Sequence, residues 1–246
     1  MAKARTTSDH INEWFETIFK LEEKIPEHTL RRMEKEISKL TNEYEKSLNY
    51  AYLYGIWGRF EEARSWLQEA RGFSKGTALA FSGAAKAALD FKTAYFALEH
   101  AYNEGWIQTK EDRSFACYIA FGVCAFNLAH KILKAKDGNL IEVNGQKISK
   151  ETLERAVKLG LEDSDVQELF TRSLRNIEKY MIDKRGPLIV DHCADDEQPG
   201  KIVLRLKIAA DPNKFGDILW DLCDIDYKGI PSEVLSSIVI NPVPAE

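Results

Sequence analysis

The chain has 246 residues, of which 44% are hydrophobic and 30% are charged. This composition is that of an ordinary globular protein, and the length suits one large domain, or a main domain with an appendage, that buries a core without disulfide staples. No stretch reaches the roughly 18 apolar residues of a membrane span, which argues against a transmembrane protein. The first residues, MAKARTTSDH, lack the apolar core of a secretory signal, so no such signal is expected.

The charge is unevenly distributed. The whole chain has a net charge of −5, whereas residues 186–246 carry five Lys or Arg against eleven Asp or Glu, a balance of −6. Nucleic-acid affinity depends on neutralising phosphates, so this acidic segment disfavours a nucleic-acid partner. A local basic face on the helical part stays open as an alternative. The cysteines are scattered and are expected to be reduced, mostly buried thiols of a cytoplasmic protein: Cys117, Cys124, Cys193 and Cys223.

The first part of the chain predicts helices. Ser8 or Asp9 is a candidate cap of a first helix, which Pro26 interrupts. Thr29 opens a long second helix, which is expected to run with little break toward residue 47. Its apolar residues follow a heptad-like spacing: Leu30, Met33, Ile37, Leu40 and Tyr44.

The stretch Ser47–Arg71 predicts two helices joined at Gly58. Glycine adopts the left-handed conformation that ends a helix without steric cost. Glu61 and Glu62 then lie in the first turn of the second helix, where the helix dipole favours negative charge. Apolar residues recur there at steps of three and four, as in an amphipathic helix: Phe60, Ala63, Leu67 and Ala70.

Seven of these residues resemble one tetratricopeptide motif, a helix–turn–helix unit of about 34 residues: Ala51, Tyr54, Gly58, Phe60, Ala63, Leu67 and Ala70. The resemblance implies a protein-binding scaffold. Lys75 stands where the proline that closes the motif is expected. A second copy lacks the turn glycine: Ser82, Ala85, Phe91, Ala94, Leu98 and Ala101. Such arrays need about three units and no third copy is apparent, so a generic multi-helix bundle is the alternative.

Residues 72–77, GFSKGT, do not have the spacing of a phosphate-binding P-loop and predict a turn. A helix rich in small residues is expected over Thr77–Tyr102. Thr109 is then a plausible helix start, because Glu111 and Asp112 follow it. Residues 115–135 are apolar nearly all round, which predicts a helix at the centre of a bundle or under an oligomer interface.

A β-hairpin is predicted near residues 139–148, because apolar residues flank the pair Asn144-Gly145. Two more helices are expected over Glu151–Leu159 and Asp163–Asp183, separated around Gly160. The sequence Arg185-Gly186-Pro187 then marks a boundary. We therefore expect a helical part over residues 1–185 and a small acidic α/β element over residues 186–246.

The C-terminal part predicts a β-β-α-β element. Leu188–Val190 is a strand candidate, and residues 202–208, IVLRLKI, alternate as in a half-buried strand. Asp211-Pro212 is a helix start. The last strand is expected over Ser236–Ile240. The helix between them is expected to bury one face: Phe215, Ile218, Leu219 and Leu222.

Three groups of residues are candidates for chemistry. Residues 191–197, DHCADDE, could supply metal ligands, but the Cys-x-x-Cys or His-x-x-x-His spacing of a metal site is missing, so an acidic turn is favoured. His130 is expected to be structural, because no second ligand lies one helical turn away. The five histidines are spread over the whole chain, and no Gly-x-Ser-x-Gly elbow or family-specific cysteine signature indicates a nucleophile–base pair.

The third group is Arg175, Asn176 and Tyr180, which resembles at a distance the helix motif of HEPN-type ribonucleases, small helical proteins of toxin and defence systems. That motif needs a histidine after the arginine, and none lies there. The resemblance implies an RNA-cleaving or RNA-binding effector whose general base is missing.

We expect a mainly α protein, either a multi-helix bundle or an array of helical hairpins, with a β-hairpin insertion and the C-terminal element. The expected function is that of a non-catalytic interaction or assembly subunit that uses helical surfaces to bind a protein partner or a second copy of itself. No catalytic, cofactor-binding or metal-binding residue is assigned. The HEPN-like effector is the alternative.

Overall fold

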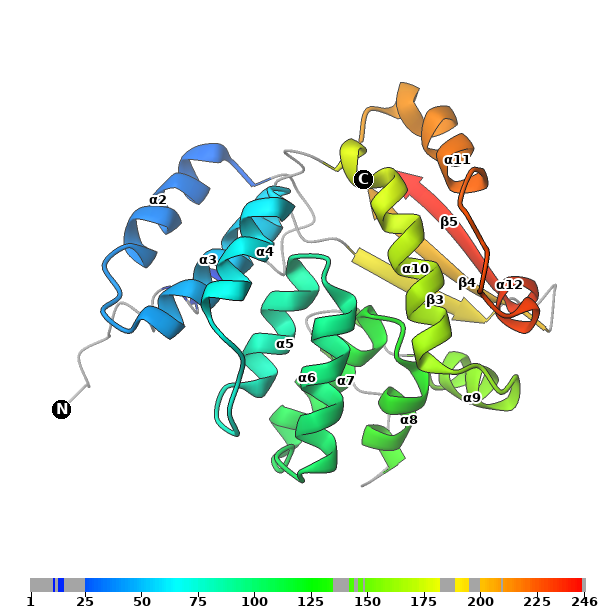
Figure 1. Cartoon of the computed structure of the whole chain (residues 1–246), viewed down its shortest axis with the longest axis horizontal. Coiled ribbons are helices and arrows are strands. Elements are labelled where there is room, and N and C mark those ends of the chain that lie inside the picture. The colour runs from blue at the N-terminus through cyan, green and yellow to red at the C-terminus, as the bar shows by residue number, and fades with distance from the viewer. Residues whose placement is uncertain are drawn as a thin grey trace.

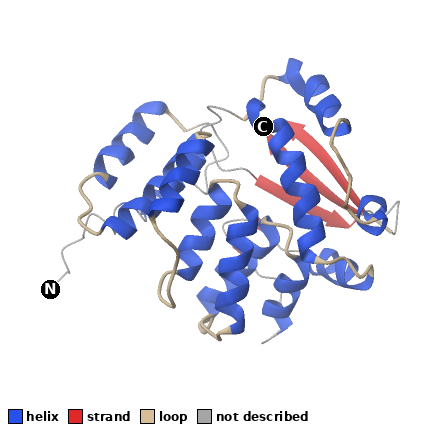
Figure 2. Cartoon of the chain, viewed as in Figure 1, coloured by secondary structure: helices blue, strands red, loops and turns tan. Residues whose placement is uncertain are grey.

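The computed structural model describes residues 11, 13–15, 25–134, 142–143, 146–147, 149–181, 189–194, 200–208 and 210–244; only the backbone is described for residues 142–143, 146–147, 189–194 and 212. The protein is mainly helical, with its larger sheet at one end (Figure 2). Its helices are α2 (Glu27–Ile37), α3 (Glu43–Trp57), α4 (Phe60–Glu69), α5 (Ala78–Ala87), α6 (Phe91–Asn103), α7 (Lys110–Gly122), α8 (Phe126–Lys134), α9 (Lys150–Lys158), α10 (Asp163–Ile177), α11 (Phe215–Cys223) and α12 (Ser232–Ser237), with the 3₁₀ turns η1 (Glu178–Tyr180) and η2 (Pro212–Lys214).

Helices α3 to α8 form three successive packed pairs, and α9 and α10 are joined by a closely similar turn without packing along each other (Figure 1). In each turn, a residue just after the first helix has the left-handed conformation: Gly58 (φ 80°), Leu89 (58°), Cys124 (59°) and Gly160 (67°). The next amide donates to a carbonyl five residues earlier, over 2.8 to 3.2 Å: Arg59 to Tyr54, Asp90 to Ala85, Ala125 to Ala120 and Leu161 to Ala156. This is the Schellman arrangement, which satisfies the carbonyl groups left free at a helix end.

Three predicted helices are interrupted. The long helix expected from Thr29 ends at Ile37, and α3 begins afresh after Asn42, whose side chain accepts a hydrogen bond from the Glu45 amide at 3.1 Å. The helix expected over 77–102 is two helices divided at Leu89, and the apolar helix expected over 115–135 is divided at Cys124. Leucine and cysteine rarely adopt the left-handed conformation, which is why neither break was predicted.

A third copy of the hairpin pattern becomes visible when the turns are aligned. The residues at the same offsets from Cys124 as the first motif has from Gly58 are Cys117, Ala120, Phe126, Ala129, Leu133 and Lys136, of which Lys136 stands in place of the motif's alanine and lies outside the described residues. Four of them are buried, and Leu133 is half-buried.

Helices α3, α5 and α7, the first helices of the three packed pairs, lie side by side, and Gly55 of α3 comes very close to α5. A methyl group at residue 55 would lie 2.4 Å from the Ala87 carbonyl oxygen of α5. That distance is far below van der Waals contact, so only glycine allows the two backbones to meet here.

We therefore predict that Gly55→Ala lowers the free energy of unfolding by about 2 kcal/mol, because the added methyl overpacks a backbone contact. Thermal denaturation should show a fall in Tm of roughly 4–8 °C. Gly76→Ala is the matched control, since nothing lies within 4 Å of a methyl group at that position. Equal Tm values for the two variants would show that the α3–α5 contact is not tight.

A buried carboxylate connects α10 to α8. Asp163 accepts hydrogen bonds from the amides of Asn127 at 2.8 Å and Leu128 at 3.0 Å, in the first turn of α8. It therefore caps a helix 36 residues away in the sequence. Burial raises the pKa of the Asp163 carboxyl to about 6, although the two amide donors act in the opposite direction.

This pKa predicts a pH-dependent stability. The unfolded carboxyl titrates near a pKa of about 3.9, so between pH 4 and 6 the folded state holds more protons than the unfolded state. The free energy of unfolding should fall by about 2 kcal/mol as the pH rises through this window, relative to Asp163→Asn, which does not titrate there. Denaturant unfolding of both proteins at pH 4, 5, 6 and 7 measures the difference. If the wild type instead gains stability relative to Asp163→Asn as the pH rises, the amide donors outweigh burial.

The C-terminal element is a three-stranded sheet in the order β3 (Ile189–Ala194), β4 (Ile202–Ile208), β5 (Ile238–Pro244). Strands β3 and β4 are antiparallel, whereas β4 and β5 are parallel and are connected through α11 and α12. The alternation predicted for β4 is confirmed: one face is buried, and Arg205 on the other face is exposed.

Two details of this element differ from the prediction. A second helix, α12, follows Pro231 and takes up residues 236–237, so the last strand begins at Ile238 and extends into the expected tail. Strand β3 includes residues 191–194 of the acidic stretch that was expected to be a turn. The small hairpin is confirmed as β1 (Glu142–Val143) and β2 (Gln146–Lys147), although its turn residues 144–145 lie outside the described residues.

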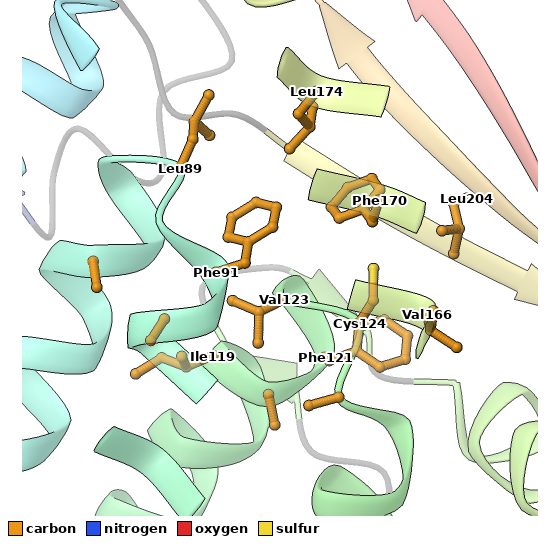
Figure 3. Close-up of a cluster of buried hydrophobic side chains, with 14 of the residues drawn as sticks. Leu89, Phe91, Ile119, Phe121, Val123, Cys124, Val166, Phe170, Leu174 and Leu204 are labelled. Carbon is orange, nitrogen blue, oxygen red and sulfur yellow. The ribbon is translucent and has the colours of Figure 1, made fainter. Parts of the chain in front are cut away.

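The helices and the sheet share one core. Phe170 of α10 stacks on Phe91 of α6, with ring centroids 5.3 Å apart, and Leu204 of β4 belongs to the same buried cluster (Figure 3). Arg64 of α4 adds a polar connection, because its guanidinium lies 2.8 Å from the Glu178 carboxylate at the end of α10. Although the secondary structure changes after residue 186, the C-terminal element thus packs directly on the helices.

Candidate functional site

A pocket of about 380 Å³ lies where α10, α11, α12 and the edge strand β5 meet. Four of its lining residues also belong to the buried core cluster, namely Leu169, Leu222, Ile225 and Ile238. Its walls are Leu169, Ser173, Leu219, Leu222, Cys223, Ile225, Tyr227, Leu235, Ile238 and Ile240. The one hydroxyl on α10 in this set, that of Ser173, donates to the Leu169 carbonyl at 2.8 Å, so the pocket offers mainly apolar contacts.

Helix α11 has more apolar surface than the fold covers. Ile218 and Leu222 face the core and are buried. Leu219, which was predicted to belong to that buried face, is 50% exposed, and Trp220 is 76% exposed. Tyr227 and Leu235, on the other side of the pocket, are each 38% exposed. We call Leu219, Trp220, Tyr227 and Leu235 the α11 patch.

Polar contacts to Asp221 hold one edge of α11 against α10 and η1. The Asp221 carboxylate accepts a hydrogen bond from the Tyr180 hydroxyl at 2.8 Å and pairs with the Lys179 ammonium at 2.8 Å. The Asn176 amide donates to the Asp221 carbonyl at 3.1 Å. The bonds from Lys179 and Tyr180 lower the pKa of the Asp221 carboxyl below its ordinary value, so this contact is present at neutral pH.

Arg172 fixes the loop that follows α11. Its guanidinium donates to the carbonyl oxygens of Asp226 at 2.6 Å and Lys228 at 2.9 Å, and the Glu168 carboxylate orients it at 2.8 Å. The Tyr227 hydroxyl donates to the Leu222 carbonyl at 3.0 Å, near the end of α11. The C-terminal part of α11 and the loop that follows it are therefore held in place by α10 and η1, which preforms this side of the pocket.

The segment that supplies the α11 and α12 sides of the pocket is acidic, and we call its exposed carboxylates the acidic rim. Residues 211–233, from η2 into α12, contain six Asp or Glu and two Lys, a balance of −4. Asp217, Asp224, Asp226 and Glu233 are exposed. An apolar pocket with a negative rim favours a ligand that is both apolar and positively charged.

The structure gives Asn176 and Tyr180 a positioning role. These two members of the HEPN-like group contact Asp221, as described above, whereas the third member, Arg175, is exposed on α10. The three residues thus lie beside the pocket, but the two with described partners use their polar atoms to hold α11.

The other sequence candidates do not converge among the described residues. The side chains of residues 191–194 and all of residues 195–197 lie outside the description, so a metal site there is untested; among the described residues no group of three His, Cys, Asp or Glu is arranged to bind a metal. Burial raises the pKa of the Cys117 thiol to about 12, which keeps it protonated, and lowers the pKa of the half-buried His130.

Comparison of the chain with protein-family models, with curated proteins and with solved structures finds no match. None of the described helices has the length and apolar character needed to cross a membrane.

The contacts of Arg172 predict a local effect of its removal. Arg172→Ala frees two backbone carbonyls and the loop that carries them, which should cost about 1.4 kcal/mol, or a tenfold increase in local opening. Hydrogen exchange followed by mass spectrometry should show about tenfold faster exchange in residues 224–230. Arg175→Ala, an exposed arginine on the same helix, is the control and should leave this exchange unchanged. Similar exchange in both variants would show that Arg172 does not hold the loop.

Proposed function

We propose that the protein is a non-catalytic interaction subunit that binds a protein partner through the α11 patch. One observation carries the proposal: four large apolar side chains are exposed by 38% to 76%, and three of them, those of Leu219, Tyr227 and Leu235, line the pocket, while Trp220 follows Leu219 in α11. Contiguous apolar surface rimmed by polar residues marks interaction sites on soluble proteins, because leaving it in water is unfavourable. Trp and Tyr are also the side chains that contribute most to protein interfaces.

The arrangement of the helices supports the same proposal. Successive hairpins with the same turn and a third copy of the residue pattern favour the array over the generic bundle, and arrays of helical hairpins present extended binding surfaces. We extend the proposal to membership of the tetratricopeptide type. A cytoplasmic location is part of it, supported by Cys117 and Cys223, which form no disulfide in the structure.

The RNA-effector alternative has less support. The polar groups of Asn176 and Tyr180 already hold α11, so Arg175 alone would face an RNA substrate. The acidic rim nearby also repels phosphates.

The test is affinity capture of the tagged protein from its native cells, with bound species quantified by mass spectrometry. Trp220→Ser removes the most exposed member of the α11 patch. The matched control is Phe96→Ser on α6, which removes another large apolar side chain, 62% exposed, far from the pocket in sequence. We expect a partner at near-stoichiometric amounts on the wild type and on Phe96→Ser, and at least tenfold less on Trp220→Ser.

Both substitutions lie on the surface, so each should change the free energy of unfolding by less than about 0.5 kcal/mol, which thermal denaturation checks. Capture of the same proteins in equal amounts by all three forms would contradict the proposal. Recovery of RNA that depends on Arg175 would favour the alternative instead.

A further inference from the structure

The shape of the site favours a helix over an extended strand as its occupant. The pocket runs between α10, α11 and α12, and grooves between helices accept the apolar face of another helix through residues spaced three and four apart. The neighbouring strand β5 lies at the edge of the sheet but carries Pro242 and Pro244, which lack the amide hydrogen. Proline at an edge prevents a further strand from pairing there.

The size of the site favours side chains over a cofactor. A volume of about 380 Å³ lies near the lower end of the range of ligand pockets, and the walls offer few groups that would orient a polar molecule. Trp220, which follows Leu219 in α11 and is 76% exposed, adds apolar surface outside the pocket lining. A ligand that fills the pocket and also covers Trp220 needs several apolar side chains on one face.

The charge of the site favours a basic partner. Asp217, Asp224 and Glu233 are exposed on or next to α11 and α12. The Asp217 carboxylate lies 3.3 Å from the Lys214 ammonium, and residues 211–233 still have a balance of −4. Two copies of this chain that met through the α11 patch would bring two acidic rims together, which costs free energy. Anionic partners such as nucleic acid are disfavoured for the same reason.

We infer that the α11 patch binds an amphipathic helix of another protein, whose apolar face enters the pocket and covers Trp220 while Lys or Arg residues on its flanks face the acidic rim. This inference rests on the proposed function and specifies the chemistry of its partner.

Three fluorescent peptides of equal length test the chemistry. The first has leucines at helical spacing with lysines on the polar face, the second has glutamates in place of the lysines, and the third has the composition of the first with the leucines evenly scattered. Fluorescence anisotropy with the full-length protein should show that the first peptide binds at least tenfold more tightly than either of the others. Raising the salt concentration should weaken its binding.

Variants locate the binding. Trp220→Ser should lower the affinity for the lysine peptide at least tenfold. The double variant Asp217→Asn, Asp224→Asn should lower this affinity about threefold to tenfold and make it less dependent on the salt concentration. Phe96→Ser should leave it unchanged. The exposed thiol of Cys223 gives a direct readout, because a bound peptide should slow its alkylation at least fivefold, measured at that residue by mass spectrometry.

Three results would overturn the inference. In the first, the lysine and glutamate peptides bind equally, and in the second, no peptide binds. The third is a lysine peptide whose affinity Trp220→Ser leaves unchanged and whose binding does not slow the alkylation of Cys223. A dimer that Trp220→Ser disrupts would identify a second copy as the occupant and would also overturn it. The two proposals fail separately. If the captured native partner depends on Trp220 but the lysine peptide does not displace it, the inference fails alone. If no captured protein depends on Trp220, the proposed function fails.

Discussion

The packing of α10 between the hairpins and the C-terminal element is the contact on which the candidate site depends. One side of this helix is fixed by Phe170, which stacks on Phe91 with the ring planes only 9° apart. The side next to α11 carries the pocket walls Leu169 and Ser173 and the polar anchor Arg172. Apolar packing fixes the position of α10 in the core. The polar residues of α10, such as Arg172, are therefore available to hold α11 and the loop that follows it.

The sequence predicted those parts of the fold whose signals are local. Gly58 and Gly160 mark their turns because glycine is the residue that most readily takes a positive φ. Leu89 and Cys124 make the same turn only because the packed helices compensate a cost of roughly 1–2 kcal/mol, and such compensation cannot be read from neighbouring residues. Asp163 was missed for a related reason, since it caps a helix that precedes it by 36 residues.

The candidate site was less predictable than the fold. The sequence showed that residues 215–223 form an amphipathic helix, but periodicity does not reveal how wide a face the rest of the chain will cover. Leu219 was assigned to the core, and Trp220 received no role, because six apolar residues in this short helix exceed what one buried face needs. Residues 176 and 180 were noticed for an enzyme motif, whereas their contacts with Asp221 serve to position α11.

The walls of the pocket come from residues that lie as far apart in the chain as Leu169 and Ile240. No shorter piece of the protein can therefore present the complete surface, and any local opening that releases β5 or α11 also destroys it. By thermodynamic linkage, a partner that binds only the assembled surface must stabilise that assembly, by about 2.7 kcal/mol when its concentration is a hundred times the Kd. The C-terminal element would then be most resistant to opening and proteolysis when it is part of the complex.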